Sequence, residues 1–237
     1  MTMAEPREPT GGSTNNRAAF DYHSSRALLR RVLIQGKPAW SSWLLEDRHE
    51  EAQTVVDFLS KVLDDRVDLE GHEEKQILSA IRLIVESPLV YPRGFRLKVV
   101  QCDLSQPLNE GRFGYIYRGR LGNRAVCVKA VRLFTQQDNT RDFLAQAKEF
   151  ALCAHLSHPN ILPCYGIYLP EPGKLKICIV SKWMQRGDLR AYLSAYPDSP
   201  RRLFLVDVAA GLEYLHKHGI IHANLKAVRR SLTLSLF

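Results

Sequence analysis

The sequence predicts an α+β fold in which a small all-α unit precedes an antiparallel sheet and a further set of helices. Three observations carry this prediction. Apolar residues recur at helical spacing before Pro88, they alternate at strand spacing after Gly94, and Pro88 and Pro92 separate the two patterns. We therefore expect a domain boundary near residue 94.

The all-α unit is expected over residues 18–92. An apolar stripe that includes Ala52, Val56 and Leu59 predicts a helix from about Arg48 to Asp64. The sequence also predicts a second helical stripe over 77–85, a weaker apolar segment over 27–34, and a polar, disordered lead over 1–17.

The sheet is expected to begin with the alternating segment Phe95–Gln101. Two further strands, Gly114–Arg118 and Ala125–Val131, flank the turn residues Gly122 and Asn123, which predicts a β-meander. The remaining elements, in order, are a helix over 142–156, strands around 161–168 and 176–180, and a helix over 203–215.

Composition excludes several classes of protein. Apolar residues make up 45% of the 237-residue chain and charged residues 24%, which is ordinary for a globular protein. The five cysteines show no C-x-x-C spacing, so we expect neither a disulfide framework nor a metal site, and an intracellular location. The net charge is +8, but no run of consecutive basic residues is longer than two, so we expect no nucleic-acid partner. No apolar run approaches the ~18 residues of a membrane span, so we expect no membrane partner.

A glycine-rich turn and a lysine in an apolar strand point to phosphate chemistry. The turn runs from Asn109 to Ile116 and contains Gly111 and Gly114, which let the backbone approach a phosphate closely. Lys129 follows in a strand where a lone ammonium is costly without an anion. Glu149, on the next expected helix, is the candidate partner, although the pair also fits a plain strand-to-helix ion pair.

These segments resemble the protein kinase family. Val126–Lys129 is similar to the V-A-I-K motif of that family, and Glu149 is similar to its αC glutamate. Further matches are L-x-H-P-N-I at 156–161, a strand entering the hinge at 179–184, the αE helix at 208–216, and Ile221–Lys226 for the catalytic loop. Details of 162–167 and 180–184 are most similar to a fungal Ser/Thr or tyrosine-kinase-like group.

The resemblance implies a kinase-like domain over 95–226, with an N-lobe made of an antiparallel sheet plus the αC helix and a partial helical C-lobe. It also implies that the glycine turn covers the phosphates of ATP, and that Lys129, held by Glu149, neutralises the α and β phosphates. The other implied nucleotide contacts are Ile116 and Cys127 against adenine, Ser181 as gatekeeper, the backbone from Lys182 to Met184, and Asp188 at the start of the next helix.

The chain departs from the family at the positions that carry out phosphoryl transfer and bind the metal. Asn224 stands where a kinase has the carboxylate that accepts the substrate proton, and Asn109 stands where it has the first loop glycine. Arg229 falls at a metal-binding asparagine, and no D-F-G follows before Phe237. We therefore expect a truncated, catalytically impaired or inactive pseudokinase with weak, Mg²⁺-independent ATP binding at most, and a tail over 227–237 outside the family pattern.

Two other interpretations stay open. The chain could be a non-catalytic scaffold that binds protein partners through the helical unit or through the αE helix, whose apolar residues lie on nearly every side. The same apolar residues also make that helix an aggregation liability. The third interpretation is an active kinase in a longer isoform, with this chain a defective version of the gene.

Overall fold

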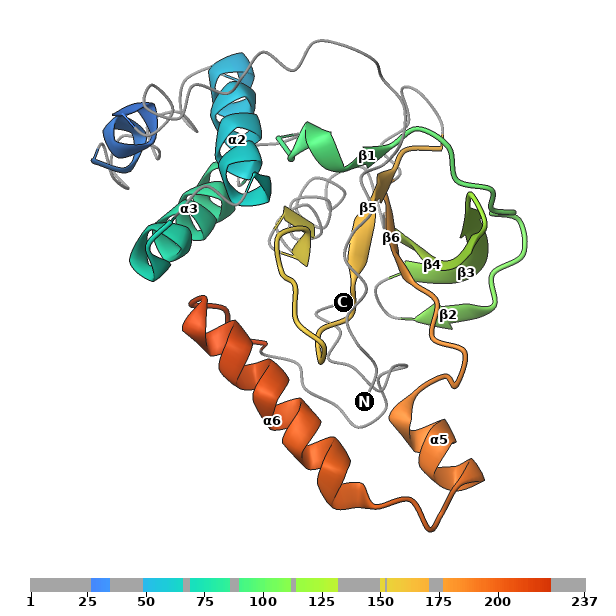
Figure 1. The fold of residues 1–237 in the computed structure, drawn as a ribbon. Helices are drawn as coiled ribbons and strands as arrows, with labels where there is room; N and C mark the ends of the chain where they lie inside the picture. Colours follow the sequence, from blue (N-terminus) through green and yellow to red (C-terminus); the bar gives the residue numbers. More distant parts are fainter. Residues whose placement is uncertain are drawn as a thin grey trace.

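Helices form at the apolar stripes that the sequence predicts before Pro88. The structure, a computed structural model, describes residues 27–34, 49–65, 69–85, 90–111, 114–131, 150–151, 153–170 and 177–222. Residues 27–34 are helical, and they are followed by α2 (His49–Asp64) and α3 (Gly71–Ile84) (Figure 1). The first turn of α3 is closed by the Glu73 carboxylate, which accepts the Glu70 N–H at 3.0 Å.

The strands of the described residues form one sheet in the order β1-β5-β6-β4-β3-β2. Their bounds are β1 Arg96–Leu97, β2 Asn109–Gly111, β3 Gly114–Leu121, β4 Arg124–Val131, β5 Cys164–Tyr168 and β6 Cys178–Lys182. All neighbouring pairs are antiparallel except β1 and β5. The expected hairpin is confirmed: β3 turns into β4 through Gly122, whose φ of 57° is the left-handed geometry that a tight hairpin requires.

The expected strand over Phe95–Gln101 is wrong in extent. Arg93–Phe95 is a 3-10 turn, only Arg96–Leu97 pairs with the sheet, and it runs parallel to β5. Gln101 makes a separate bridge to Arg120. Phe95 leaves the strand because its ring packs edge-on against the rings of Phe150 and His155, at centroid distances of 6.2 and 5.1 Å.

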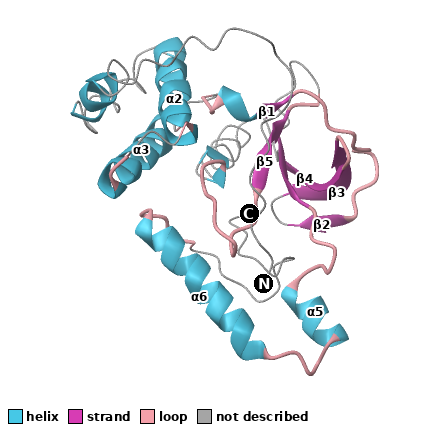
Figure 2. Cartoon of the chain, viewed as in Figure 1, coloured by secondary structure: helices cyan, strands magenta, loops and turns pink. Residues whose placement is uncertain are grey.

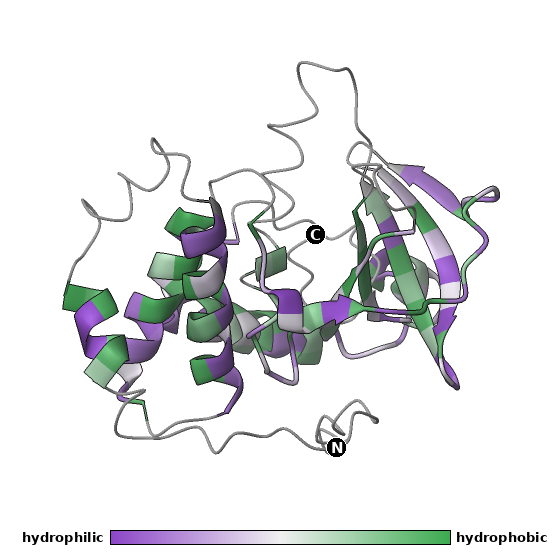
Figure 3. Cartoon of the chain, turned by 90° about the horizontal axis from the view of Figure 1, so that it is seen from above, coloured by the Kyte–Doolittle hydropathy of each residue, from purple (hydrophilic) through white to green (hydrophobic). Residues whose placement is uncertain are grey.

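A single hydrophobic core joins the all-α unit to the sheet. Its buried residues come from the helix at 27–34, α2, α3, the helical residues near 150, β5 and β6. Figure 3 shows hydrophobic and hydrophilic residues on different sides of the helices of the all-α unit. Because one core runs across residue 94, the predicted division into domains stays a prediction.

Two helices follow the sheet, α5 (Leu189–Ala195) and α6 (Arg201–Lys217) (Figure 2). Only the last part of α6 is well buried, and Leu215 packs there with Leu156, Ile161 and Ile220. Near its start, Leu203, Leu205 and Val206 are 61–69% exposed. The apolar exposure expected for this helix is therefore confirmed.

Candidate functional site

Most of the candidate nucleotide contacts share one face of the sheet. The register pairs Asn109 with Ile116, Ile116 with Lys129, and Cys127 with Ser181. Residues that are directly paired, or that lie two apart along one strand, are on the same side of a sheet. The residues gathered by this rule are Asn109, Gly111, Gly114, Ile116, Cys127, Lys129 and Ser181. We call this set the candidate face.

The opposite side of the same strands is closed by a second core. Tyr117, Val126, Val128 and Val180 are buried there, together with Val100. Ile116, Cys127 and Lys129 are only half-buried. On the candidate face, Ile116, Cys127 and Lys129 thus remain partly accessible, whereas Ser181 is buried.

Lys129 lies in the middle of β4. In register it is flanked by Ile116 of β3 and by Ile179 of β6. Ile179 is fully buried in the core that also contains Phe150, so this face is turned toward the helical residues near 150. An ammonium group between two isoleucines interacts more strongly with an anion than it would in water, because the local dielectric is lower.

The glycine turn is built as a hairpin between β2 and β3. Gly111 pairs directly with Gly114, which leaves two residues between the strands, and these two lie outside the described residues. Gly114 has a φ of 144°, a backbone conformation that residues with a Cβ rarely adopt. A glycine is therefore required at the point where the hairpin re-enters the sheet.

The segment after β6 leads from the candidate face into α5. Ser181 is buried, at 5% exposure, at the end of β6. The Lys182 N–H donates to the Pro163 carbonyl at 3.1 Å, and the Met184 carbonyl accepts the Gly187 N–H at 3.2 Å. Asp188 caps α5, as predicted, by accepting the Ala191 N–H at 2.6 Å.

Several predicted residues lie outside the described part of the chain. Glu149 lies just before Phe150, where the description of the chain resumes, and Asn224 and Arg229 follow the last described residue, His222. The pairing of Lys129 with Glu149 and the role of Asn224 therefore stay predictions.

Arg118 is a residue of the candidate face that the motif comparison missed. It pairs in register with Cys127, and its guanidinium carbon lies 5.3 Å from the ring centroid of Trp183. Trp183 stands between Lys182 and Met184, so this cation–π contact joins the face to the segment that follows β6. The alternation of β3 alone, through Gly114, Ile116 and Arg118, was a signal that would have found it.

The described ranges hold no metal-ligand cluster and no membrane-spanning helix. In those ranges, no three His, Cys, Asp or Glu side chains gather as metal ligands. No helix among the described residues has the length and apolar character needed to cross a bilayer.

Comparison with known proteins places the same residues in a family. The family model described as protein tyrosine and serine/threonine kinase matches residues 102–232, which is more than half of the chain. The serine/threonine/tyrosine-protein kinase HT1 of Arabidopsis thaliana is 39% identical over 139 residues, 53% of this chain. The mouse serine/threonine-protein kinase TNNI3K is 30% identical over 57% of this chain, and the human NUAK family SNF1-like kinase 1 is 27% identical over 52%. The matched regions span only 35%, 17% and 19% of these three relatives.

Proposed function

Because the chain belongs to the protein tyrosine and serine/threonine kinase family, we propose that its candidate face binds ATP and that the chain transfers little or no phosphoryl group. The observation that carries the proposal is the register of β2, β3, β4 and β6, which gathers the glycine hairpin, Lys129 and Ser181 on one side of the sheet. The chemistry of these residues fits a nucleotide.

Each part of the face has a separate task in this proposal. The hairpin at Gly111 and Gly114 brings backbone close to the phosphates, because neither residue carries a Cβ. Lys129 supplies the positive charge for the α and β phosphates. Ile116 and Cys127 supply the half-buried surface on which the adenine ring lies.

The segment after β6 would hold the edge of the adenine ring. The Lys182 N–H is directed to Pro163, so the donor in this segment is assigned to the backbone of Met184. Ser181, buried at the end of β6, limits how deeply the ring enters. Asp188 contributes by starting α5 directly after this segment.

The absence of efficient transfer is proposed from two residue types in the sequence. At position 224 an amide replaces the carboxylate that would accept the proton, and loss of general-base catalysis typically costs about 10²- to 10⁴-fold in rate. At position 229 a guanidinium repels Mg²⁺. We therefore expect ATP binding to be weak and to depend little on Mg²⁺.

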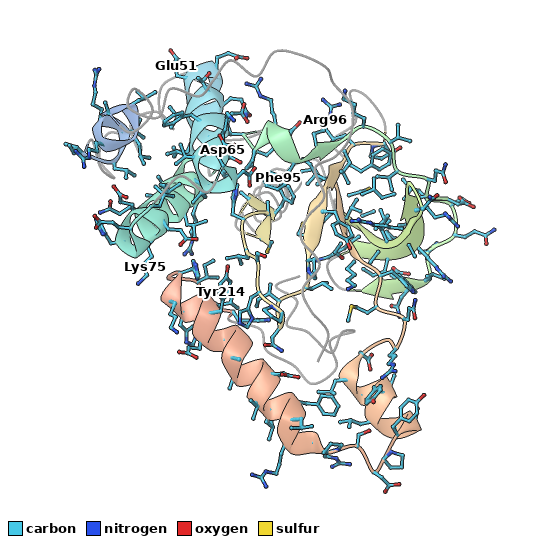
Figure 4. All side chains as sticks on the ribbon, viewed as in Figure 1. Glu51, Asp65, Lys75, Phe95, Arg96 and Tyr214 are labelled. Carbon is cyan, nitrogen blue, oxygen red and sulfur yellow. The ribbon has the colours of Figure 1, made fainter. Side chains whose placement is uncertain are left out.

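A thermal-shift titration with ATP, with and without Mg²⁺, tests the proposal. The midpoint should rise with ATP in both conditions, because a ligand that binds only the folded state stabilises it. Lys129→Met should abolish the rise. Lys75→Met, an exposed lysine on α3 far from the sheet, should preserve it (Figure 4). A wild-type midpoint that ignores ATP in both conditions would overturn the proposal.

A scaffold function is the second candidate, and one observation favours it for α6. Leu203, Leu205 and Val206 are large apolar side chains exposed on the first half of α6, and exposed apolar surface of this kind binds partners. The helical unit is less suited to this role through its apolar faces, because those of α2 and α3 are buried in the shared core. Pull-down with and without Leu205→Glu would test the α6 surface.

A further inference from the structure

Helix α2 carries a polar stripe beside its apolar one, and two of its four residues are buried. The polar stripe has helical spacing, and each of its residues comes one position after a residue of the apolar stripe. Its members are Gln53, Asp57, Ser60 and Asp64. Gln53 and Ser60 are both only 4% exposed. Buried polar side chains are retained when they are hydrogen-bonded, so their partners show what the stripe holds.

The first half of the stripe holds the segment that leaves α3. The Gln53 side-chain amide donates to the Tyr91 carbonyl at 2.8 Å and accepts the Tyr91 N–H at 3.4 Å. The Asp57 carboxylate accepts both the backbone N–H and the Nε–H of Arg93, at 2.8 and 2.6 Å. These contacts fix residues 91–93 on α2, two positions before Phe95 enters the core.

The second half of the stripe holds His155. Its Nε2 lies 3.1 Å from the Ser60 hydroxyl, and its Nδ1, which makes no hydrogen bond to a described residue, lies 3.5 Å from the Asp64 carboxylate. The imidazole is 2% exposed and receives Phe95 edge-on. Ser60 and His155 are 95 residues apart in sequence, so this contact ties the all-α unit to the segment after the helix near 150.

The same segment is held from the other side by α6. The Ser157 N–H donates to the Tyr214 hydroxyl at 3.0 Å, and the His158 ring stacks on Tyr214 at 4.8 Å (Figure 4). One turn later, His218 lies 3.3 Å from the carboxylate of Glu74 on α3. Helices α2 and α3 therefore contact both the 155–158 turn and the end of α6, which closes a ring of contacts (Figure 1).

This ring connects to the candidate face through the shared core. Phe150, fully buried, directly follows Glu149 in sequence and packs in one cluster with Val56 of α2 and Ile77 of α3. Ile179 belongs to that cluster as well and is the register partner of Lys129. A shift of the 155–158 turn relative to α2 thus disturbs the packing around Ile179, the neighbour of Lys129 in the sheet.

We propose that α2 and α3 form an intramolecular clamp, which holds the 155–158 turn against α6 and thereby sets the nucleotide affinity of the candidate face. The proposal rests on the proposed function. It assigns Ser60 and Asp64 as positioning residues that act through His155 and touch no nucleotide.

Two neighbouring carboxylates of α2 offer a matched test. Asp64 faces His155, whereas Asp65 pairs with Lys61 of the same helix at 2.7 Å, and the two side chains are 43% and 38% exposed. The double variant Ser60→Ala/Asp64→Asn should weaken ATP binding by at least about 5-fold, the lower end of typical coupling between sites. Asp65→Asn should change the dissociation constant by less than about 2-fold.

Affinity is measured by calorimetric titration of the full chain with ATP, at a temperature where every variant is folded by its melting curve. Hydrogen exchange without ATP gives a second readout: the double variant should speed exchange at amides 155–158 and 214–220, and Asp65→Asn should not. A wild-type chain that fails to bind ATP overturns the proposed function and the clamp with it. A double variant that binds ATP as tightly as the wild-type chain, or that leaves exchange unchanged in both segments, overturns the clamp alone.

Discussion

Replacing Gly166 by alanine tests how closely the segment after the all-α unit lies on the sheet. Gly166 is in β5 with a φ of 154°, a conformation that an L side chain rarely adopts. A Cβ added there would collide with the backbone carbonyl oxygen of Phe95 and lie 3.0 Å from Cγ of Leu97. Because the first obstacle is backbone, β1 has to move away from β5.

The expected cost has two parts. An unfavourable backbone conformation costs about 1–3 kcal/mol, and overpacking a tight contact costs about 1–3 kcal/mol more. A central total of about 4 kcal/mol, at about 3 °C per kcal/mol for a chain of this size, lowers Tm by about 12 °C.

Urea unfolding followed by circular dichroism measures this loss, with two other glycines as controls. Gly122→Ala meets no atom within 4 Å but has a φ of 57°, so it should cost about 1–2 kcal/mol. Gly71→Ala meets no atom and needs no unusual φ, so it should be neutral or stabilise by up to about 1 kcal/mol. If Gly166→Ala lost no more stability than Gly122→Ala, the close approach of Phe95 to β5 would be refuted.

Three further predictions concern other parts of the chain. Burial lowers the pKa of His158 below its ordinary value of 6.5, an effect that Glu213 partly offsets, so the folded state favours the neutral ring that accepts the Asn160 N–H. The stabilisation from the neutral His158 ring is therefore full above about pH 6.5 and is lost as the pH falls through the lowered pKa. In urea titrations, His158→Gln should lose less stability between pH 8 and 5.5 than the wild type. Equal losses in the two proteins would contradict this prediction. Asp188→Ala removes the cap of α5 and should cost about 0.5–2 kcal/mol in the same assay, whereas an unchanged midpoint would mean that the cap is not used. Leu205 is 69% exposed, so Leu205→Glu should change the free energy of unfolding by less than about 0.5 kcal/mol. The same variant should reduce self-association in sedimentation velocity. A marked loss of stability would show that this side chain is covered.

Local patterns predicted the elements that local physics determines. The apolar stripes of α2 and α3 need only helical periodicity, and the β3–β4 hairpin needs only alternation and Gly122. Motif spacing also predicted a glycine turn and a lysine near one another, and the strand register confirmed that Gly114 and Lys129 share a face.

Contacts between distant segments were beyond those patterns. Phe95 was expected in a strand, but its ring packs on Phe150 and His155, more than 50 residues away, and this packing overrides the local alternation. The contacts of the polar stripe of α2 could not be predicted either, because its partners are distant in sequence. Ser60 and Asp64 read as a solvated helix face until His155 is placed beside them.

The surroundings of Lys129 depend on both halves of the molecule. Lys129 comes from the sheet, and the core that contains its register partner Ile179 draws residues from α2, α3 and the helical residues near 150. A sequence comparison limited to residues 102–232 covers only part of this arrangement. Relatives that lack an equivalent of α2 and α3 would need another support for the 155–158 turn.

The most direct test of the central claim is single-turnover transfer of labelled γ-phosphate from ATP to a peptide mixture or to the chain itself, with Mg²⁺ present. We expect ATP to bind to the wild-type chain and the wild type to transfer no more label than Lys129→Met. Transfer by the wild type that disappears in Lys129→Met would contradict the claim that this face binds a nucleotide without passing on its phosphate.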